Sequence, residues 1–202
     1  MKEKVQKKSL LSSEATIRRL AISAAFMVAW LLIWALVLKL GSQVLLIRNY
    51  NNMKDMTFIE RIKWDLIPFN YRGTDHQKRQ LFIDSVLNCF VFAPLALTFC
   101  YAFQKRNVWR DLGICLGFSV FVEMLQLFSM LGNPAPEDLI TNVAGYFIGL
   151  GLYHLCFKHI PKKATAILFI VFNIIFAIAT VFSIVTTVRA LPLIIKIVTR
   201  TL

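Results

Sequence analysis

The sequence predicts an all-α integral membrane protein, folded as a single bundle of about five transmembrane helices. Of its 202 residues 57% are hydrophobic, and 17 are Phe. The apolar residues are gathered into five runs that are each long enough to cross a bilayer as a helix. A water-soluble domain of this size could not bury so much apolar surface.

The charge balance fits the same class. The chain carries 23 Lys and Arg against 11 Asp and Glu, a net charge of +12. The basic residues flank the apolar runs, where they interact with anionic lipid headgroups and set topology. This placement favours a membrane surface over nucleic acid as the partner. The 3 His are scattered and the 4 Cys fall inside apolar runs, so we expect no metal and no cofactor.

The elements follow in order along the chain. A basic cytoplasmic tail over 1–19 precedes the first span, which is too long for the core of a cleaved signal peptide. A short tail over 189–202, partly apolar, ends the chain. The predicted five-helix bundle occupies 20–188, with spans at about 20–38, 81–103, 112–130, 136–157 and 164–188.

The connection over 39–80 is polar but contains one helix signal. Thr57 and Glu60 have the spacing of a capping box, and an apolar stripe follows them as far as Pro68. The pattern predicts a short interfacial helix between the first and second spans. The alternative is a solvated loop.

Short loops predict the orientation. The links over 104–111 and 158–163 each carry three basic residues, whereas the turn over 131–135 carries none. We therefore expect a cytoplasmic N-terminus and an extracytoplasmic C-terminus. The connection over 39–80 disagrees, because its eight Lys and Arg would lie outside.

Polar side chains inside the spans converge at one level. Three spans each carry a carboxylate and an amide on one helical face, in the half nearest the predicted outer surface. Ionisable residues within membrane spans are costly and mark functional sites by default. The pattern predicts an outer-leaflet polar pocket, and the alternative is that the same groups only hold helices together. The predicted pocket residues are Asp84, Asn88, Glu123, Gln126, Asp138, Asn142 and Gly145.

The predicted pocket has no basic residue inside the spans. The outer connection supplies Arg61, Lys63 and Arg72, which with Pro68 and Phe69 form a candidate lid over it.

The same residues resemble the VanZ-like family of small membrane proteins, named for teicoplanin resistance. The shared pattern, over about 65–149, is LIPF at 66–69, Asn88 with PL at 94–95, ExxQ at 123–126 and DxxxNxxG at 138–145. Family members usually carry an Arg midway between the Gln and the Asp, where this chain has Gly132 and Asn133. The resemblance implies a multi-pass protein of the bacterial plasma membrane that lowers susceptibility to lipoglycopeptide antibiotics such as teicoplanin.

Three functions remain open at this level. In the first, the pocket binds the lipid part of the antibiotic or an envelope lipid, without catalysis. In the second, the protein is an enzyme acting on a lipid-linked envelope precursor, with Glu123 and Asp138 as the acid–base pair. The third, a small lipid transporter, is weakest because the polar groups occupy only one leaflet. The expected partners are membrane lipids or a lipid-linked envelope precursor and, in the first function, also the lipoglycopeptide antibiotic.

Overall fold

A computed structural model of the chain describes residues 13–38, 41–57, 60, 75–103, 107–129, 131 and 136–199. These residues form helices and include no strand. The helices are α1 (Glu14–Leu36), α2 (Gln43–Met53), α4 (Asp75–Ala102), α5 (Val108–Ser129), α6 (Pro136–Leu155), the 3-10 turn η3 (Phe157–His159) and α7 (Lys162–Val198). Five of the described helices are long and apolar enough to cross a membrane, which confirms the predicted all-α membrane fold.

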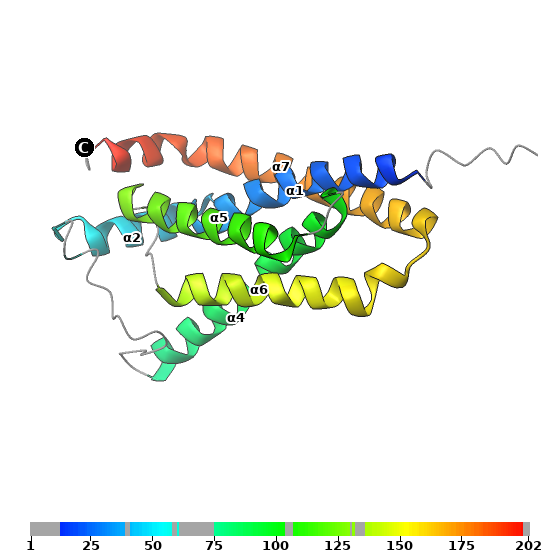
Figure 1. Ribbon diagram of the computed structural model, residues 1–202. Helices are drawn as coiled ribbons and strands as arrows, with labels where there is room; N and C mark the ends of the chain where they lie inside the picture. The colour runs from blue at the N-terminus through cyan, green and yellow to red at the C-terminus, as the bar shows by residue number, and fades with distance from the viewer. Residues whose placement is uncertain are drawn as a thin grey trace, which may run out of the picture.

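The bundle has two clearly defined pairs of helices. In Figure 1, α1 and α7 run side by side, and α4 crosses α6 obliquely. Between the pairs lies a core of apolar side chains from four helices, including Leu32 of α1, Phe92 of α4, Cys115 of α5 and Tyr146 of α6. Helix α5 packs against α6 and α4 and shares this core with α1, with its polar face buried inside the bundle.

Two glycines bring α6 and α4 into backbone contact. A Cβ atom on Gly145 would lie 2.2 Å from the carbonyl oxygen of Cys89, and one on Gly149 would lie 2.2 Å from that of Ala93. Both distances are far below van der Waals contact, so the crossing tolerates only glycine at these positions. The four-residue spacing of the pair already indicates such an approach.

Polar contacts join α1 to α7. The indole Nε1 of Trp30 donates to Ser183 Oγ at 2.6 Å, and that of Trp34 donates to Thr186 Oγ1 at 3.1 Å. Asn173 Nδ2 donates to the carbonyl oxygen of Leu20 at 3.0 Å. Since lipid offers no competing partners, such bonds help to hold one helix to the other.

The structure differs from the sequence-based prediction at several boundaries. Helices α1, α4 and α5 begin four to six residues earlier than predicted, because charged residues at a span's end leave the membrane without breaking the helix. Helix α7 continues to Val198, through most of the predicted tail over 189–202. Its last turns are helical because Ala190 and Ile197 are buried in a core with Leu46 of α2 and Val122 of α5.

Helix α2 was not predicted. Ser42 caps it, accepting a hydrogen bond from the Leu45 backbone N–H at 3.4 Å, and its Leu46 is fully buried. Gly41 precedes the cap with φ of 70°, a conformation that disfavours other residues. The missed signal is therefore a serine cap directly after a glycine turn.

The predicted capping box is present just beyond α2. The Glu60 carboxylate accepts from the Thr57 backbone N–H and from the Thr57 hydroxyl, both at 2.8 Å, and the Glu60 N–H donates back to Thr57 Oγ1 at 3.3 Å. The hydrogen bond from the Thr57 backbone, followed by that from its hydroxyl, lowers the pKa of Glu60. The interfacial helix predicted after this box lies outside the described residues.

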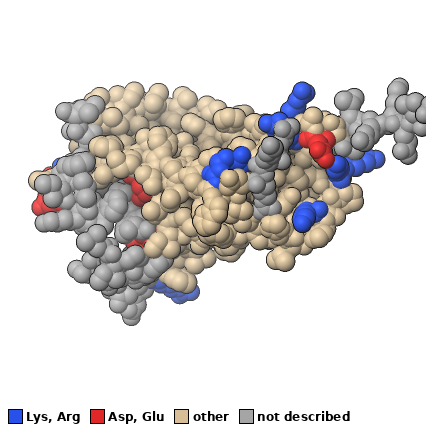
Figure 2. Space-filling view, in the orientation of Figure 1, with Lys and Arg blue, Asp and Glu red and all other residues tan. Residues whose placement is uncertain are grey.

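Charged side chains gather at the two ends of the bundle. Figure 2 shows Lys and Arg side chains grouped at the end where α1 and α7 begin, with an acidic patch among them. This is the predicted cytoplasmic end. Apart from one basic group near its middle, the described surface between the two ends carries few charged side chains in this view, as expected of a membrane-spanning region.

Candidate functional site

The site residues lie at the predicted outer end of the bundle, where α5 ends and α6 begins (Figure 1). Within α5 and α6, Glu123 and Asn142 each lie six residues from that end of their helix, which is about 9 Å of helix length. Asp138 is in the first turn of α6, where the helix dipole favours an anion. The residues thus extend inward from the rim of the bundle.

The rim contact joins α4 to α6. Asn88 Nδ2 donates to Asp138 Oδ1 at 2.7 Å, and this bond links residues 50 positions apart in the sequence. A distance of this length is at the short end of the usual range for N–H···O hydrogen bonds. The structure therefore brings together one amide and one carboxylate from two of the three predicted pairs.

A deeper contact joins α6 to α5. Asn142 Nδ2 donates to Ser119 Oγ at 2.8 Å, and both side chains are completely enclosed. The other end of the Asn142 amide, Oδ1, is buried and has no hydrogen-bond partner. An amide oxygen can only accept, so this group lacks a donor.

Gln126 has the same arrangement one level closer to the rim. Its Nε2 donates to the Leu36 carbonyl oxygen of α1 at 2.9 Å, and its Oε1 is buried without a partner. Glu123 is buried on the same face of α5, one turn deeper than Gln126 and one turn nearer the rim than Ser119. Along α5, a carboxyl group therefore lies between Gln126 and the serine that accepts from Asn142.

We call these six side chains the polar cluster. Its members come from three helices and are Asn88, Ser119, Glu123, Gln126, Asp138 and Asn142. Among the described residues no group of His, Cys, Asp and Glu is arranged to hold a metal ion. The cluster offers carboxylates and amide acceptors, which suit a ligand rich in N–H or O–H donors.

Gly145 contributes through packing. It lies one turn beyond Asn142 on α6. There it packs against the α4 backbone at Cys89, the residue that follows Asn88. The close approach that it permits sets the spacing between the helices that carry Asn88 and Asp138.

Some predicted residues lie outside the description. Asp84 is in α4, but its side chain is not among those described. The candidate lid (Arg61, Lys63, Pro68, Phe69 and Arg72) and the turn residues Gly132 and Asn133 also lie outside the described residues. Their roles stay predictions.

Two groups in these contacts were not predicted from the sequence, the Ser119 hydroxyl and the Leu36 carbonyl. Ser119 lies four residues before Glu123 and seven before Gln126, so the helical period places all three on one face of α5. That periodicity could have identified it. The Leu36 carbonyl has no sequence signal, because any residue at the end of α1 would offer one.

Comparison with known proteins supplies a family. The model of the VanZ/LLP1 family matches residues 25–158. Protein VanZ of Enterococcus faecium is 28% identical over 132 residues, which cover 65% of this chain and 72% of that protein. The comparison with solved structures finds no match. The matched region contains the whole polar cluster.

Proposed function

Because the chain belongs to the VanZ/LLP1 family, we propose that it lowers the susceptibility of a bacterial cell to lipoglycopeptide antibiotics such as teicoplanin. The proposal extends to this chain the teicoplanin resistance for which the VanZ-like family is named, and Protein VanZ of Enterococcus faecium is one of its relatives. The family match spans α4, α5 and α6, the three helices that carry the polar cluster. On this proposal the polar cluster is the site through which the protein confers resistance.

We further propose that the cluster binds a membrane-resident ligand by its donor-bearing head, either an envelope lipid or the lipid-bearing part of the drug. The observation that carries this step is the pair of buried acceptors without donors, Gln126 Oε1 and Asn142 Oδ1. Leaving a polar atom buried and unsatisfied costs about 1 to 3 kcal/mol. A ligand that donates to both oxygens removes that cost when it binds.

The position of the cluster suits this role. It extends about 9 Å inward from the helix ends at the predicted outer surface, the depth of a lipid headgroup and the first part of its chains. Lipoglycopeptides act from outside the cell. A protein that binds in the outer leaflet could therefore contact the drug, or a lipid that the drug uses, before the drug reaches its target.

Deletion and complementation test the resistance role. We expect deletion to raise susceptibility to teicoplanin more than to vancomycin, since only the former carries a lipid chain. The wild-type gene should restore resistance. Equal susceptibility of the deletion strain and its parent to both drugs would contradict the proposal.

Glu123→Gln separates binding from catalysis. The substitution keeps the size of the side chain but replaces one carboxyl oxygen by an NH2 group, which removes its proton-transfer chemistry. Binding predicts that the variant retains most of the resistance at normal expression. Complete loss, together with a change in envelope lipids by mass spectrometry between wild type and variant, would favour the enzyme with Glu123 and Asp138 as acid and base.

A further inference from the structure

A second feature of the molecule lies at the opposite end of the bundle from the polar cluster. A cavity of about 540 Å³ opens where α1 and α7 begin and where α4 and α6 end. A cavity of this size can enclose a small ligand or a lipid headgroup. Its walls come from the first two turns of α1, the last turn of α4, the end of α6 with η3, and the start of α7.

The rim of the cavity is strongly basic. Arg18, Arg19, Lys158 and Lys162 line it, against one carboxylate, Glu14. Lys162 Nζ lies 2.5 Å from Glu14 Oε1, so that pair is neutralised. Within the described part of the chain the other three cations have no ion-pair partner, and their mutual repulsion favours an added anion.

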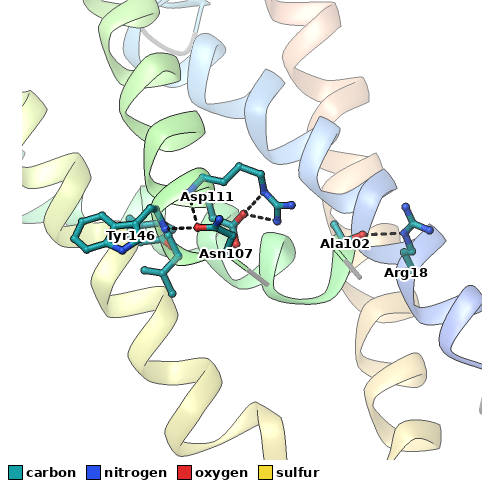
Figure 3. Close-up of polar contacts among 8 residues, drawn as sticks. Arg18, Ala102, Asn107, Asp111 and Tyr146 are labelled. Atoms are coloured by element: carbon teal, nitrogen blue, oxygen red, sulfur yellow. Dashed lines mark hydrogen bonds and ion pairs between the residues drawn. The ribbon is translucent and has the colours of Figure 1, made fainter. Parts of the chain in front are cut away.

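Arg18 is held in place at this rim. Its Nε donates to the carbonyl oxygen of Ala102 at 2.9 Å, at the C-terminal end of α4 (Figure 3). That bond uses one of the five N–H groups of the guanidinium, whose remaining donors suit a phosphate. The side chain is therefore ordered before any ligand arrives, which lowers the entropic cost of binding.

The interior of the cavity is aromatic. Tyr101 packs edge-on against Tyr153 with ring centroids 5.2 Å apart, and its hydroxyl donates to the Phe157 carbonyl oxygen at 2.9 Å. Ile17 and Ile22 of α1 line the same space. Cations at the rim and aromatic or aliphatic side chains beneath them match a lipid, whose charged head adjoins its apolar chains.

We propose that this cavity binds the phosphate headgroup of an anionic phospholipid. The phosphate lies among Arg18, Arg19 and Lys158, and the glycerol and upper chains rest on the Tyr101–Tyr153 surface. Anionic lipids give the cytoplasmic leaflet its negative potential, which agrees with the predicted orientation of this end. Three of the four cations at this cavity, Arg18, Arg19 and Lys162, lie outside the family match over 25–158.

The test uses the purified full-length protein in non-ionic detergent. The midpoint of thermal unfolding is followed as phosphatidylglycerol is added, with phosphatidylcholine and inorganic phosphate as parallel titrations. We expect phosphatidylglycerol to raise the midpoint at concentrations where the other two do not. No shift, or an equal shift with phosphatidylcholine, would overturn the proposal, and an equal shift with inorganic phosphate would overturn the assignment to lipid.

Two matched variants locate the site. Lys158→Gln removes a cation that lines the cavity, whereas Lys163→Gln removes a nearby exposed cation that does not line it. We expect the Lys158 variant to need about fivefold more phosphatidylglycerol than the wild type for the same rise in the unfolding midpoint. The Lys163 variant should need the same amount as the wild type. Equal weakening by both would show a diffuse surface effect and contradict a built site. Lys158 is preferred to Arg18 because Arg18 also bonds the end of α4.

Discussion

Two regions of this bundle carry polar side chains inside the membrane, and they use them differently. In the α1–α7 pair, Trp30, Trp34 and Asn173 each donate across or along the helix pair to a defined acceptor. In the polar cluster, Gln126 and Asn142 also donate, but each keeps a buried amide oxygen with no donor. The three donors named in the first region each have an acceptor, whereas the second region lacks donors that a ligand could supply.

The α7 helix has two hydroxyls, of Thr180 and Thr187, that are also buried without a partner. Unlike the two amide oxygens, these hydroxyls do not indicate a ligand site. A threonine hydroxyl rotates and can donate to a carbonyl of its own helix at little cost. The oxygen of a primary amide cannot donate, so only an outside N–H or O–H group satisfies it. The chemistry of the orphan atom therefore distinguishes a binding site from helix packing.

The largest expected effect comes from breaking the helix crossing that supports the cluster. In Gly149→Ala the new methyl would meet the Ala93 carbonyl oxygen at 2.2 Å, so α6 must move away from α4. We expect a loss of about 2 to 3 kcal/mol in the free energy of unfolding, from the cost of overpacking. Unfolding in mixed micelles would measure it.

Gly151→Ala is the matched control, because a Cβ at Gly151 meets no atom within 4 Å. Its stability should equal that of the wild type or exceed it slightly, given the higher helix propensity of Ala. Similar losses for both glycine variants would show that the crossing is not as tight as described.

A smaller effect is expected in the α1–α7 pair. Ser183→Ala leaves the indole N–H of Trp30 without its acceptor. Hydrogen bonds between membrane helices contribute about 0.6 kcal/mol on average, so we expect a loss of that order with resistance unchanged. A drop in resistance at unchanged expression would remove the distinction between the two regions.

The smallest expected effect is a change in the pKa of Glu60, in the capping box that lies outside both regions. The pKa of Glu60 is lowered by its bonds to Thr57, so the capping box is intact above the ordinary Glu pKa and is lost as pH falls through the lowered value. Carboxyl carbon NMR of the wild type and of Thr57→Ala should show the Glu60 titration moving upward in the variant. An unchanged midpoint would mean that the box does not persist in solution.

The sequence predicted the helical bundle and most of the polar cluster for one physical reason. Charged and amide groups in apolar runs are rare, and helical spacing places Glu123 with Gln126, and Asp138 with Asn142, on one face each. In the structure the Asp138–Asn142 face of α6 also meets α4, because Asn88 Nδ2 donates to Asp138 Oδ1.

What the sequence could not supply depends on tertiary contacts. The length of α7 follows from the burial of Ala190 and Ile197 against other helices, which no local signal reports. The partner of Gln126 is a backbone carbonyl at Leu36, 90 positions away. The basic cavity combines residues from three separate segments, over 14–22, 100–103 and 153–165, so it forms only when the helices are assembled.

The central claim is that the polar cluster binds a ligand and does more than hold helices together. Its most direct test is the double variant Ser119→Ala/Asn142→Leu, which removes both members of one hydrogen bond together with the orphan oxygen. Replacing both partners by apolar groups is close to neutral for stability. The control Asn173→Leu removes an amide that bonds the Leu20 carbonyl in the α1–α7 pair.

The measurement is teicoplanin susceptibility of complemented deletion strains, read beside the unfolding midpoint of each purified protein. We expect the double variant to unfold at or above the wild-type midpoint while its strain is as susceptible as the deletion. The Asn173→Leu protein should unfold earlier, while its strain keeps wild-type resistance. Full resistance in the double variant, at normal expression, would contradict the claim and leave the cluster as helix packing alone.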